Sequence, residues 1–255
     1  MKRSAPRATS SRRPPRLSAV SYVDDRLAEL AQRWALPGAA VGKLLTILDL
    51  VQAEPTSITT VRDPERGVDL HISDALAGLS VRALREADSI ADLGSGGGFP
   101  GLALAVALPR TRVTLVESVG KKCKFLQRAA DAANLPNVDI VNARAEAWVG
   151  GLNSQDVVTA RALGPLNVIV EYAAPLLKEG GSFVAWKGKR DPSAEADGVF
   201  AAEAVGMDAT DLIPVESIAG DRHLYVYLKV RETPPQFPRR EGMARKRPLQ
   251  GSIRA

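Results

Sequence analysis

The side chains with the clearest chemical potential lie in and after one glycine-rich segment, residues 91–101, which reads Ala-Asp-Leu-Gly-Ser-Gly-Gly-Gly-Phe-Pro-Gly. This segment joins a predicted strand, 89–93, to a predicted helix, 100–108. Glycine lets the backbone take positive φ and approach a ligand closely, and proline suits the first turn of a helix. A second predicted strand, 112–116, leads directly to Glu117, whose carboxylate can accept hydrogen bonds from both hydroxyls of a ribose. The spacing therefore predicts a binding site for a cofactor that contains a nucleoside.

Two classes of cofactor fit such a loop. Residues 96–101 match the G-x-G-x-x-G pattern of nicotinamide enzymes, which is a weak signal on its own. In the competing frame Asp92 ends the strand, and Gly94 and Gly96 follow at alternate positions, which is the pattern of methyltransferases that use S-adenosylmethionine. A carboxylate can bind the amine of the methionine half of that cofactor, but it would repel a pyrophosphate. The residues therefore favour S-adenosylmethionine over NAD, and we expect Asp92, Gly94 and Gly96 to contact it.

The elements around this loop alternate between strand and helix, which predicts an α/β fold with a parallel sheet covered on both faces. Five parallel strands are followed by an antiparallel hairpin, so the expected architecture is a Rossmann-like seven-stranded sheet with the cofactor at the carboxyl ends of the first two strands. The predicted strands are 89–93, 112–116, 138–141, 156–160 and 182–186, with the hairpin at 209–214 and 223–230; the helices between them are 100–108, 120–133, 165–178 and 193–205.

Charge and composition divide the chain into four regions. The net charge is +5, yet the first 16 residues carry six basic side chains and no acidic one, and residues 231–255 carry seven basic and two acidic side chains. Both ends are rich in proline and arginine, so they are expected either to hold a polyanion through its phosphates or to be solvated ends without a partner. We expect a basic disordered tail (1–19), an N-terminal helical cap (20–86), a methyltransferase domain (87–230) and a second basic disordered tail (231–255).

The composition also excludes several classes of protein. The chain has no run of about 18 apolar residues, so no membrane span is expected. Cys123 is the single cysteine and only two histidines occur, so we expect neither a disulfide nor a metal site. Cys123 lies at the start of a predicted helix and is expected to be a small packing residue. His71 and Asp74 share a helix face, and we expect a packed histidine beside a carboxylate. A cytoplasmic monomer is the simplest expectation.

Six motifs occur in the order in which one protein family carries them. They are Ala-Asp-Leu-Gly-Ser-Gly-Gly-Gly-Phe-Pro-Gly (91–101), Val-Glu-Ser-Val-Gly-Lys-Lys-x-Lys-Phe-Leu (116–126), Ala-Arg-Ala-Glu (143–146), Thr-Ala-Arg-Ala (159–162), Trp-Lys-Gly-Lys (186–189) and Asp-Arg-His-Leu (221–224). Through these motifs the chain resembles, from about residue 20 to 230, the bacterial 16S ribosomal RNA guanine-N7 methyltransferases, also called glucose-inhibited division protein B.

The resemblance implies a class I methyltransferase that moves a methyl group from S-adenosylmethionine to N7 of guanine 527, in rRNA numbering, with 16S rRNA or the small ribosomal subunit as its partner. It implies cofactor contacts at the ends of the first four strands, by Gly94, Phe99, Glu117, Ala145, Glu146 and Arg161. The chain departs from the family upstream, where Ser57-Ile58-Thr59 stands in the place of the usual Asn-Leu-Thr. That departure concerns how the cap meets RNA rather than the cofactor site.

Arg161 is the residue expected to position the substrate, because its guanidinium at the end of the fourth strand can bind a phosphate or guanine O6 beside N7. The alternative is a structural salt bridge to Glu117 or Asp92. No general base is expected, since guanine N7 has a free lone pair at neutral pH. Six further basic residues at strand ends are expected to form an RNA-binding rim, the alternative for each being a solvated surface charge: Lys121, Lys122, Arg144, Lys187, Lys189 and Arg190.

Three other functions stay open at this point. The first is a methyltransferase of the same fold that acts on another RNA or on a small molecule. The second is an NAD-dependent oxidoreductase, and the third is a catalytically silent RNA-binding module. Binding of S-adenosylhomocysteine but not NAD would exclude the second, and methyl transfer would exclude the third.

Overall fold

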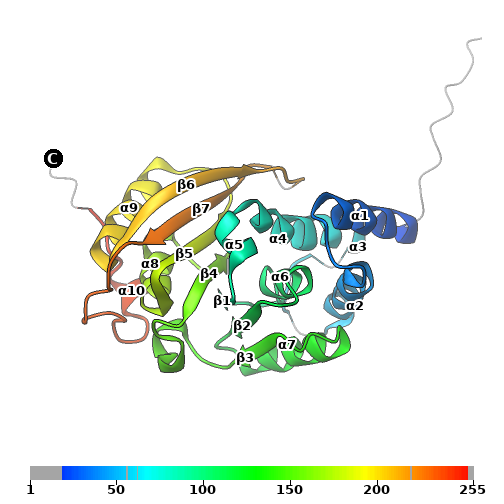
Figure 1. The fold of residues 1–255 in the computed structure, drawn as a ribbon, viewed down its shortest axis with the longest axis horizontal. Helices are drawn as coiled ribbons and strands as arrows, with labels where there is room; N and C mark the ends of the chain where they lie inside the picture. The colour runs from blue at the N-terminus through cyan, green and yellow to red at the C-terminus, as the bar shows by residue number, and fades with distance from the viewer. Residues whose placement is uncertain (1–18, 56, 62, 219, 252–255) are drawn as a thin grey trace, which may run out of the picture.

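A computed structural model describes residues 19–251 except positions 56, 62 and 219, and its centre is one seven-stranded sheet (Figure 1). The strand order is β3-β2-β1-β4-β5-β7-β6, with β7 antiparallel to both of its neighbours and the first five strands parallel. The expected α/β class and Rossmann-like sheet are confirmed. The strands are β1 (Ser89–Leu93), β2 (Arg112–Val116), β3 (Val138–Val141), β4 (Gln155–Arg161), β5 (Leu177–Lys187), β6 (Met207–Val215) and β7 (Arg222–Lys229).

Helices cover both faces of the sheet, and the side-chain alternation of the strands assigns residues to one face or the other. Ile90 belongs to the core that includes the helical cap and α6 (Gly101–Ala107), whereas Ala91 belongs to the core on the opposite face, which includes α8 (Leu166–Ala173) and α9 (Pro192–Val205). Figure 1 shows these two helical layers on either side of the strands. Two hydrophobic cores result, one on each face of the sheet.

The N-terminal cap is built from short helices that share a core with the sheet. Its elements are α1 (Ala19–Arg33), α2 (Ala40–Ala53), α3 (Pro64–Gly67), a π-helix (Val68–Ser73), α4 (Asp74–Leu76), a 3₁₀ turn (Ala77–Ser80) and α5 (Arg82–Glu86). Leu44, Leu48 and Ile72 are fully buried in the same cluster as Leu102 and Phe125 of the sheet domain. Phe125 belongs to α7 (Gly120–Ala132), which lies under α2 (Figure 1).

The structure ends the helix after β4 earlier than the expected residue 178. Helix α8 stops at Ala173, a 3₁₀ turn follows, and β5 already begins at Leu177. Pro175 lies in that turn, and proline has no N–H with which to continue a helix. In the cap, α3 begins after Asp63, whose side chain caps it by accepting a hydrogen bond from the Arg66 backbone N–H at 2.8 Å.

The C-terminal segment corrects another expectation. Residues 231–251 were expected to be part of a disordered tail, but they include a helix, α10 (Met243–Lys246), and pack beside α8 (Figure 1). Ala244 is buried, and Phe237 and Leu249 are partly buried against the core. The low apolar content is offset by ion pairs and backbone hydrogen bonds. Of the expected first tail, residues 1–18 lie outside the described residues. No helix in the described part of the chain could span a membrane.

Candidate active site

A cavity of about 510 Å³ lies at the carboxyl ends of β1, β4 and β5, between the cap and the sheet. The glycine loop forms one wall, the cap forms another, and the ends of β5 and β7 form a third. The lining residues are Ile58, Thr59, Thr60, Val61, Leu70, His71, Asp74, Gly94, Ser95, Gly96, Gly97, Phe99, Lys122, Arg161, Ala162, Trp186, Lys187, Gly188 and Arg222. The edge of the sheet at which the sequence predicted a ligand is therefore hollow.

The glycine loop is shaped by backbone that other residues rarely adopt. Gly94 and Gly96 have φ of +67° and +56°. A Cβ at Gly94 would lie 2.5 Å from Cδ1 of Leu163, which covers the loop from the segment after β4. The loop starts where the Gly94 N–H donates to the Val116 carbonyl at 2.8 Å, so β2 holds its first residue. The result is a stretch of bare backbone that lines the cavity.

Glu117, which the sequence predicts to hold a ribose, is bonded to this loop. Its Oε2 accepts a hydrogen bond from the Gly96 N–H at 3.0 Å, and its Oε1 accepts one from the Val119 N–H at 2.8 Å. Glu117 is 5% exposed and lies next to the cavity rather than among its lining residues. An ionised carboxylate has about four acceptor positions, so these two bonds leave capacity for the hydroxyls of a ribose.

Asp92 is buried between β1, β4 and the start of α6. It is 1% exposed, its Oδ1 accepts from the Thr159 hydroxyl at 2.9 Å and its Oδ2 from the Gly101 N–H at 3.3 Å. Burial raises the pKa of this carboxyl to about 6, against the opposing effect of those hydrogen bonds. Each oxygen thus has a protein partner, and the expectation that Asp92 also contacts the cofactor stays a prediction. Asp92 joins β1 to β4 and to the start of α6, and so holds the loop.

Arg161 ends β4 and points to the cap. Its Nη1 donates to Oδ2 of Asp74 at 2.9 Å and to the carbonyl of Leu70 at 3.0 Å. Its guanidinium carbon lies 5.8 Å from the centre of the Phe99 ring. Arg161 therefore does form a salt bridge, but with Asp74 rather than with either partner considered in the sequence. Its side chain remains 17% exposed and lines the cavity, so part of it faces the space where a substrate would lie.

His71 completes this cluster. Its ring stacks on Phe99 with a centroid distance of 5.0 Å, and its Nε2 lies 3.0 Å from the Thr59 hydroxyl. Its Nδ1 is 3.4 Å from Nη2 of Arg161, whereas Asp74, its expected neighbour, pairs with the arginine. Burial, and then the charge of Arg161, lower the pKa of His71 to about 4, so the imidazole is neutral at pH 7. The cap thus supplies a histidine, a carboxylate and a hydroxyl to the site.

Asp74 carries an unsatisfied acceptor. Its Oδ1 is buried and has no hydrogen-bond partner among the described residues, although Oδ2 is paired with Arg161. The backbone carbonyl of Asp74 accepts from Nε1 of Trp186 at 2.8 Å, which fixes the residue against the end of β5. No contiguous sequence signal pointed to Asp74 as a partner of Arg161, because the two residues are 87 positions apart.

The six predicted rim residues do not form one set. Lys122 and Lys187 line the cavity, and burial lowers the pKa of Lys187, whose ammonium donates to the Gly164 carbonyl. Lys121 and Lys189 are exposed on the surface. Sequence reasoning missed Arg222, which lines the cavity from the start of β7.

The two arginines of the predicted rim are paired with acids. Arg144 Nε lies 3.3 Å from Glu241, and Arg190 forms a two-pronged contact with Glu195 at 2.9 and 2.6 Å. These contacts neutralise part of the charge that the sequence assigned to the rim.

Ala145 and Glu146 lie beyond β3, in a 3₁₀ turn (Ala145–Ala147), on the side of the glycine loop away from the cavity lining. Oε1 of Glu146 accepts a hydrogen bond from the Gly242 N–H at 2.9 Å. Cys123 is buried, and its thiol donates to the Glu117 carbonyl at 3.2 Å, in line with the expected packing role. Within the described part of the chain, no three His, Cys, Asp or Glu residues are arranged to hold a metal ion.

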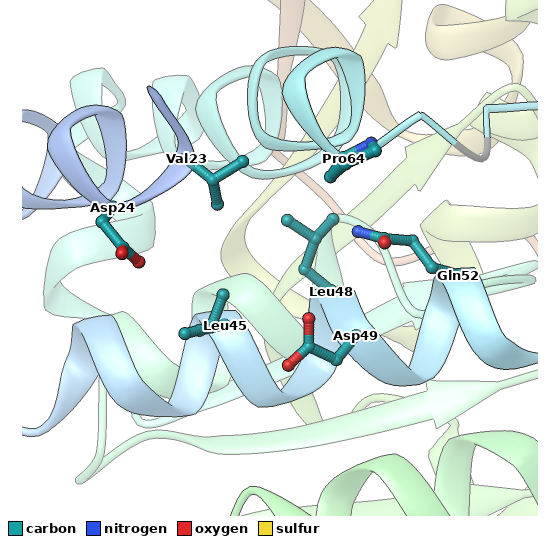
Figure 2. Close-up of a pocket in the computed structure, with 7 residues that line it drawn as sticks. All are labelled: Val23, Asp24, Leu45, Leu48, Asp49, Gln52 and Pro64. Atoms are coloured by element: carbon teal, nitrogen blue, oxygen red, sulfur yellow. The ribbon is translucent and has the colours of Figure 1, made fainter. Parts of the chain in front are cut away.

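A second hollow, of about 300 Å³, lies in the cap between α1, α2 and α3 (Figure 2). Val23, Leu45 and Leu48 form its apolar wall, and Asp24 and Asp49 stand beside it (Figure 2). It is far from the glycine loop in sequence and shares no lining residue with the larger cavity. Two carboxylates would repel a phosphate backbone, so this hollow does not suit RNA or a nucleotide.

Comparison with known proteins shows which family the sequence matches. The family model for rRNA small subunit methyltransferase G matches residues 43–224. The ribosomal RNA small subunit methyltransferase G of Rubrobacter xylanophilus is 39% identical over 203 residues, which cover 76% of this chain and 78% of the relative. Its namesake from Staphylococcus aureus is 34% identical over 200 residues, which cover 77% of this chain and 84% of that one.

Among solved structures, a fibrillarin pre-rRNA processing protein from Methanococcus jannaschii has a similar fold. The TM-score is 0.51 at 18% sequence identity, over 62% of this chain and 74% of the other. At that identity the likeness concerns the fold alone.

Proposed function

Since the chain belongs to the family of rRNA small subunit methyltransferase G, we propose that it transfers a methyl group from S-adenosylmethionine to N7 of guanine 527 in 16S ribosomal RNA, to give 7-methylguanosine. Methyl transfer to small-subunit rRNA is the activity that names the family. The observation that carries the proposal is the glycine loop beside a cavity of about 510 Å³. The Gly96 N–H of this loop donates a hydrogen bond to the carboxylate of Glu117.

The residues present fit S-adenosylmethionine. Bare backbone at Gly94 and Gly96 borders the cavity, which leaves room for the methionine half of the cofactor. The carboxylate of Glu117 would hold the ribose, and the turn with Ala145 and Glu146 would border the adenine. When bound, the cofactor supplies a methyl group on a sulfonium, which is electrophilic enough to need no further activation. Phe99 lines the same cavity and would pack beside it.

The chain's own task is to place guanine N7 in line with that methyl group. N7 attacks through a free lone pair, so no residue has to remove a proton first, and catalysis consists mainly of positioning. His71 is neutral and tied to Thr59 and Phe99, so it shapes the cavity without serving as a base. The guanidinium of Arg161, held by Asp74, is aimed to donate to guanine O6 or to a phosphate.

Basic side chains at the cavity support RNA as the substrate. Lys122, Lys187 and Arg222 line it, and Lys121 and Lys189 extend the positive charge over the nearby surface. In this proposal Arg144 and Arg190 stay within reach of RNA, but each must exchange an acidic partner for a phosphate. The substrate is 16S rRNA or the small subunit, the enzyme is a monomer without a metal ion, and the compartment is the cytoplasm, where ribosomal subunits are found.

The two predicted regions contribute different parts of the site. Residues 20–86 act as a helical cap that contributes Thr59, His71 and Asp74 to the substrate side of the cavity. Residues 87–230 act as the methyltransferase domain that holds the cofactor. The two share a hydrophobic core, so we expect them to unfold together.

Two measurements test the function. In the first, small subunits from a strain lacking the gene are incubated with the protein and labelled S-adenosylmethionine, and the methylated nucleotide is mapped. Methylation of N7 at guanine 527 is expected, and label at another atom or in another RNA would replace the proposed substrate. In the second, calorimetric titration should detect binding of S-adenosylhomocysteine and none of NAD; the reverse result would favour an oxidoreductase.

A further inference from the structure

The C-terminal segment 231–251 lies outside the region that the family model matches, which ends at residue 224, yet it contacts the two loops beside the cofactor site. In Figure 1 it runs back along α8 and places α10 next to that helix. The segment is therefore not described by the family model, and its contacts determine what it can do.

The segment is anchored firmly to α8. Arg239 Nε donates to Oε1 of Glu171 at 2.6 Å, and its Nη2 donates to the other oxygen of the same carboxylate. Glu171 is 2% exposed, so this two-pronged pair is a buried anchor. Near the other end, the Asn167 side chain donates to the Leu249 carbonyl at 2.7 Å. The residues between these two anchors are thereby held in place.

Between the anchors, the segment contacts the turn proposed to border the adenine. The Gly242 N–H donates to Oε1 of Glu146 at 2.9 Å, and Glu241 forms an ion pair with Arg144 at 3.3 Å. Gly242 has a φ of +73°, a conformation that glycine adopts readily, and this turn of the backbone presents its N–H to the carboxylate.

A second contact holds the loop after β4. Arg245 Nη2 donates to the Leu163 carbonyl at 2.8 Å, and the Leu163 side chain lies directly over Gly94 of the glycine loop. The neighbouring Ala162 has a φ of +56°, which is unfavourable for a residue with a Cβ and needs support from its surroundings. Tyr172 lies near both contacts: burial and then the charge of Glu146 raise the pKa of its hydroxyl, and Arg245 lowers it.

We infer that residues 231–251 form a C-terminal clasp in which Gly242 and Arg245 are positioning residues for the two loops, 144–147 and 161–165, that border the cofactor. This inference rests on the proposed cofactor site. The clasp affects cofactor binding, because it orders two loops that would otherwise become ordered only when the cofactor binds. Loops that are ordered in advance raise the affinity for the ligand. Weakening the clasp should therefore raise the Kd and the KM for the cofactor.

The test compares two single substitutions in the full-length protein. Arg245→Met removes the hydrogen bond to Leu163 but keeps a side chain of similar length. Lys246→Met removes a neighbouring exposed charge that has no ion pair or side-chain hydrogen bond within the described part of the chain. Calorimetric titration with S-adenosylhomocysteine should give a Kd roughly three- to tenfold higher for Arg245→Met, as expected for the loss of one partly exposed charged hydrogen bond, and an unchanged Kd for Lys246→Met. Arg245→Lys, which can still donate one bond, should recover most of the affinity.

Hydrogen exchange gives an independent readout. Amides in 144–147 and 161–165 should exchange faster in Arg245→Met than in the unmodified protein, and those of β5 should not change. An unchanged Kd together with unchanged exchange in these loops would overturn the clasp. If Arg245→Met does not fold, Arg245→Gln replaces it. The same two measurements, the Kd for S-adenosylhomocysteine and hydrogen exchange in the two loops, then support or overturn the clasp. Failure of the unmodified protein to bind S-adenosylhomocysteine would instead refute the proposed cofactor, and is thus a distinct result.

Discussion

The guanidinium of Arg161 and the carboxylate of Asp74 form a hydrogen-bonded ion pair at 2.9 Å, and this contact joins the end of β4 to the helical cap. The pair places a cation at the cavity wall, and because Asp74 is itself fixed through Trp186, the arginine has a defined direction. A substrate-positioning arginine needs such support, since a free side chain would lose most of its binding free energy in becoming ordered. The cap is in this way part of the active site.

Replacing Arg161 should separate substrate positioning from cofactor binding. We expect Arg161→Ala to lower methyl transfer to undermethylated small subunits at least about 100-fold, because the target guanine is no longer held in line. The Kd for S-adenosylhomocysteine should stay within about threefold, since the glycine loop is intact. Arg161→Lys is the control that keeps the charge and loses the planar fork. Full activity of Arg161→Ala in the methyl-incorporation assay would remove the residue from the site.

Gly94 should be intolerant of a side chain for two reasons that a matched variant can separate. Gly94→Ala combines a φ of +67° with a Cβ 2.5 Å from Leu163, and should lower stability by about 1–3 kcal/mol and weaken cofactor binding. Gly180→Ala introduces a similar strain, at φ +81°, where nothing lies within 4 Å of the new Cβ. Chemical denaturation should show a lower free energy of unfolding for both variants. Titration with S-adenosylhomocysteine should show a lower affinity for Gly94→Ala alone. Equal affinities would mean that the loop does not border the cofactor.

His71 should make the fold less stable in acid. Its pKa in the folded protein is about 4, below the ordinary value near 6.5, so protonation favours the unfolded chain. Its stabilising contribution is present above pH 6.5 and is lost as the pH falls towards 4, by up to about 3 kcal/mol. His71→Gln, which cannot titrate, should show a shallower fall in the free energy of unfolding over that range. Parallel curves for the two proteins would show that the imidazole is not held neutral.

Asp92 should change the pH dependence of stability in the direction opposite to His71, over an overlapping pH range. Its folded pKa of about 6 lies above the ordinary value of 3.8, so folding favours the protonated form. The associated stability is present below pH 3.8 and is lost as the pH rises through 6, by up to about 3 kcal/mol. Asp92→Asn should abolish this loss, so its free energy of unfolding relative to the unmodified protein should rise between pH 4 and 7.

Removing the hydrogen-bonding capacity of Asp92 tests its structural role. Asp92→Ala should cost about 1–3 kcal/mol below pH 3.8, where the carboxyl is protonated in both states, because it leaves the Gly101 N–H and the Thr159 hydroxyl without their acceptor. The cost should shrink as the pH rises through 6, because the variant also lacks the buried carboxylate charge. An Asp92→Asn protein with the same pH dependence as the unmodified chain would show that the carboxyl titrates normally.

Much of the fold could be predicted from the sequence because its signals are local. The alternation of apolar strands and helices predicted the order of elements along the chain, and the bounds of β1, β2 and β3 agree with the predicted ones. The pairing of the glycine loop with Glu117 was also predictable, because the carboxyl ends of adjacent parallel strands meet at one edge. Repeating local patterns carry this information without any knowledge of distant contacts.

Tertiary contacts decided the rest. Asp92 has the sequence position of a ligand-binding acid, yet the packing of β4 and α6 around it encloses both of its oxygens. The partner of Arg161 comes from a cap residue far away in the chain, and the segment 231–251 is ordered by a glutamate 68 residues before its arginine. The energy of such a contact depends on which distant groups share a low-dielectric space, and only the folded chain brings those groups together.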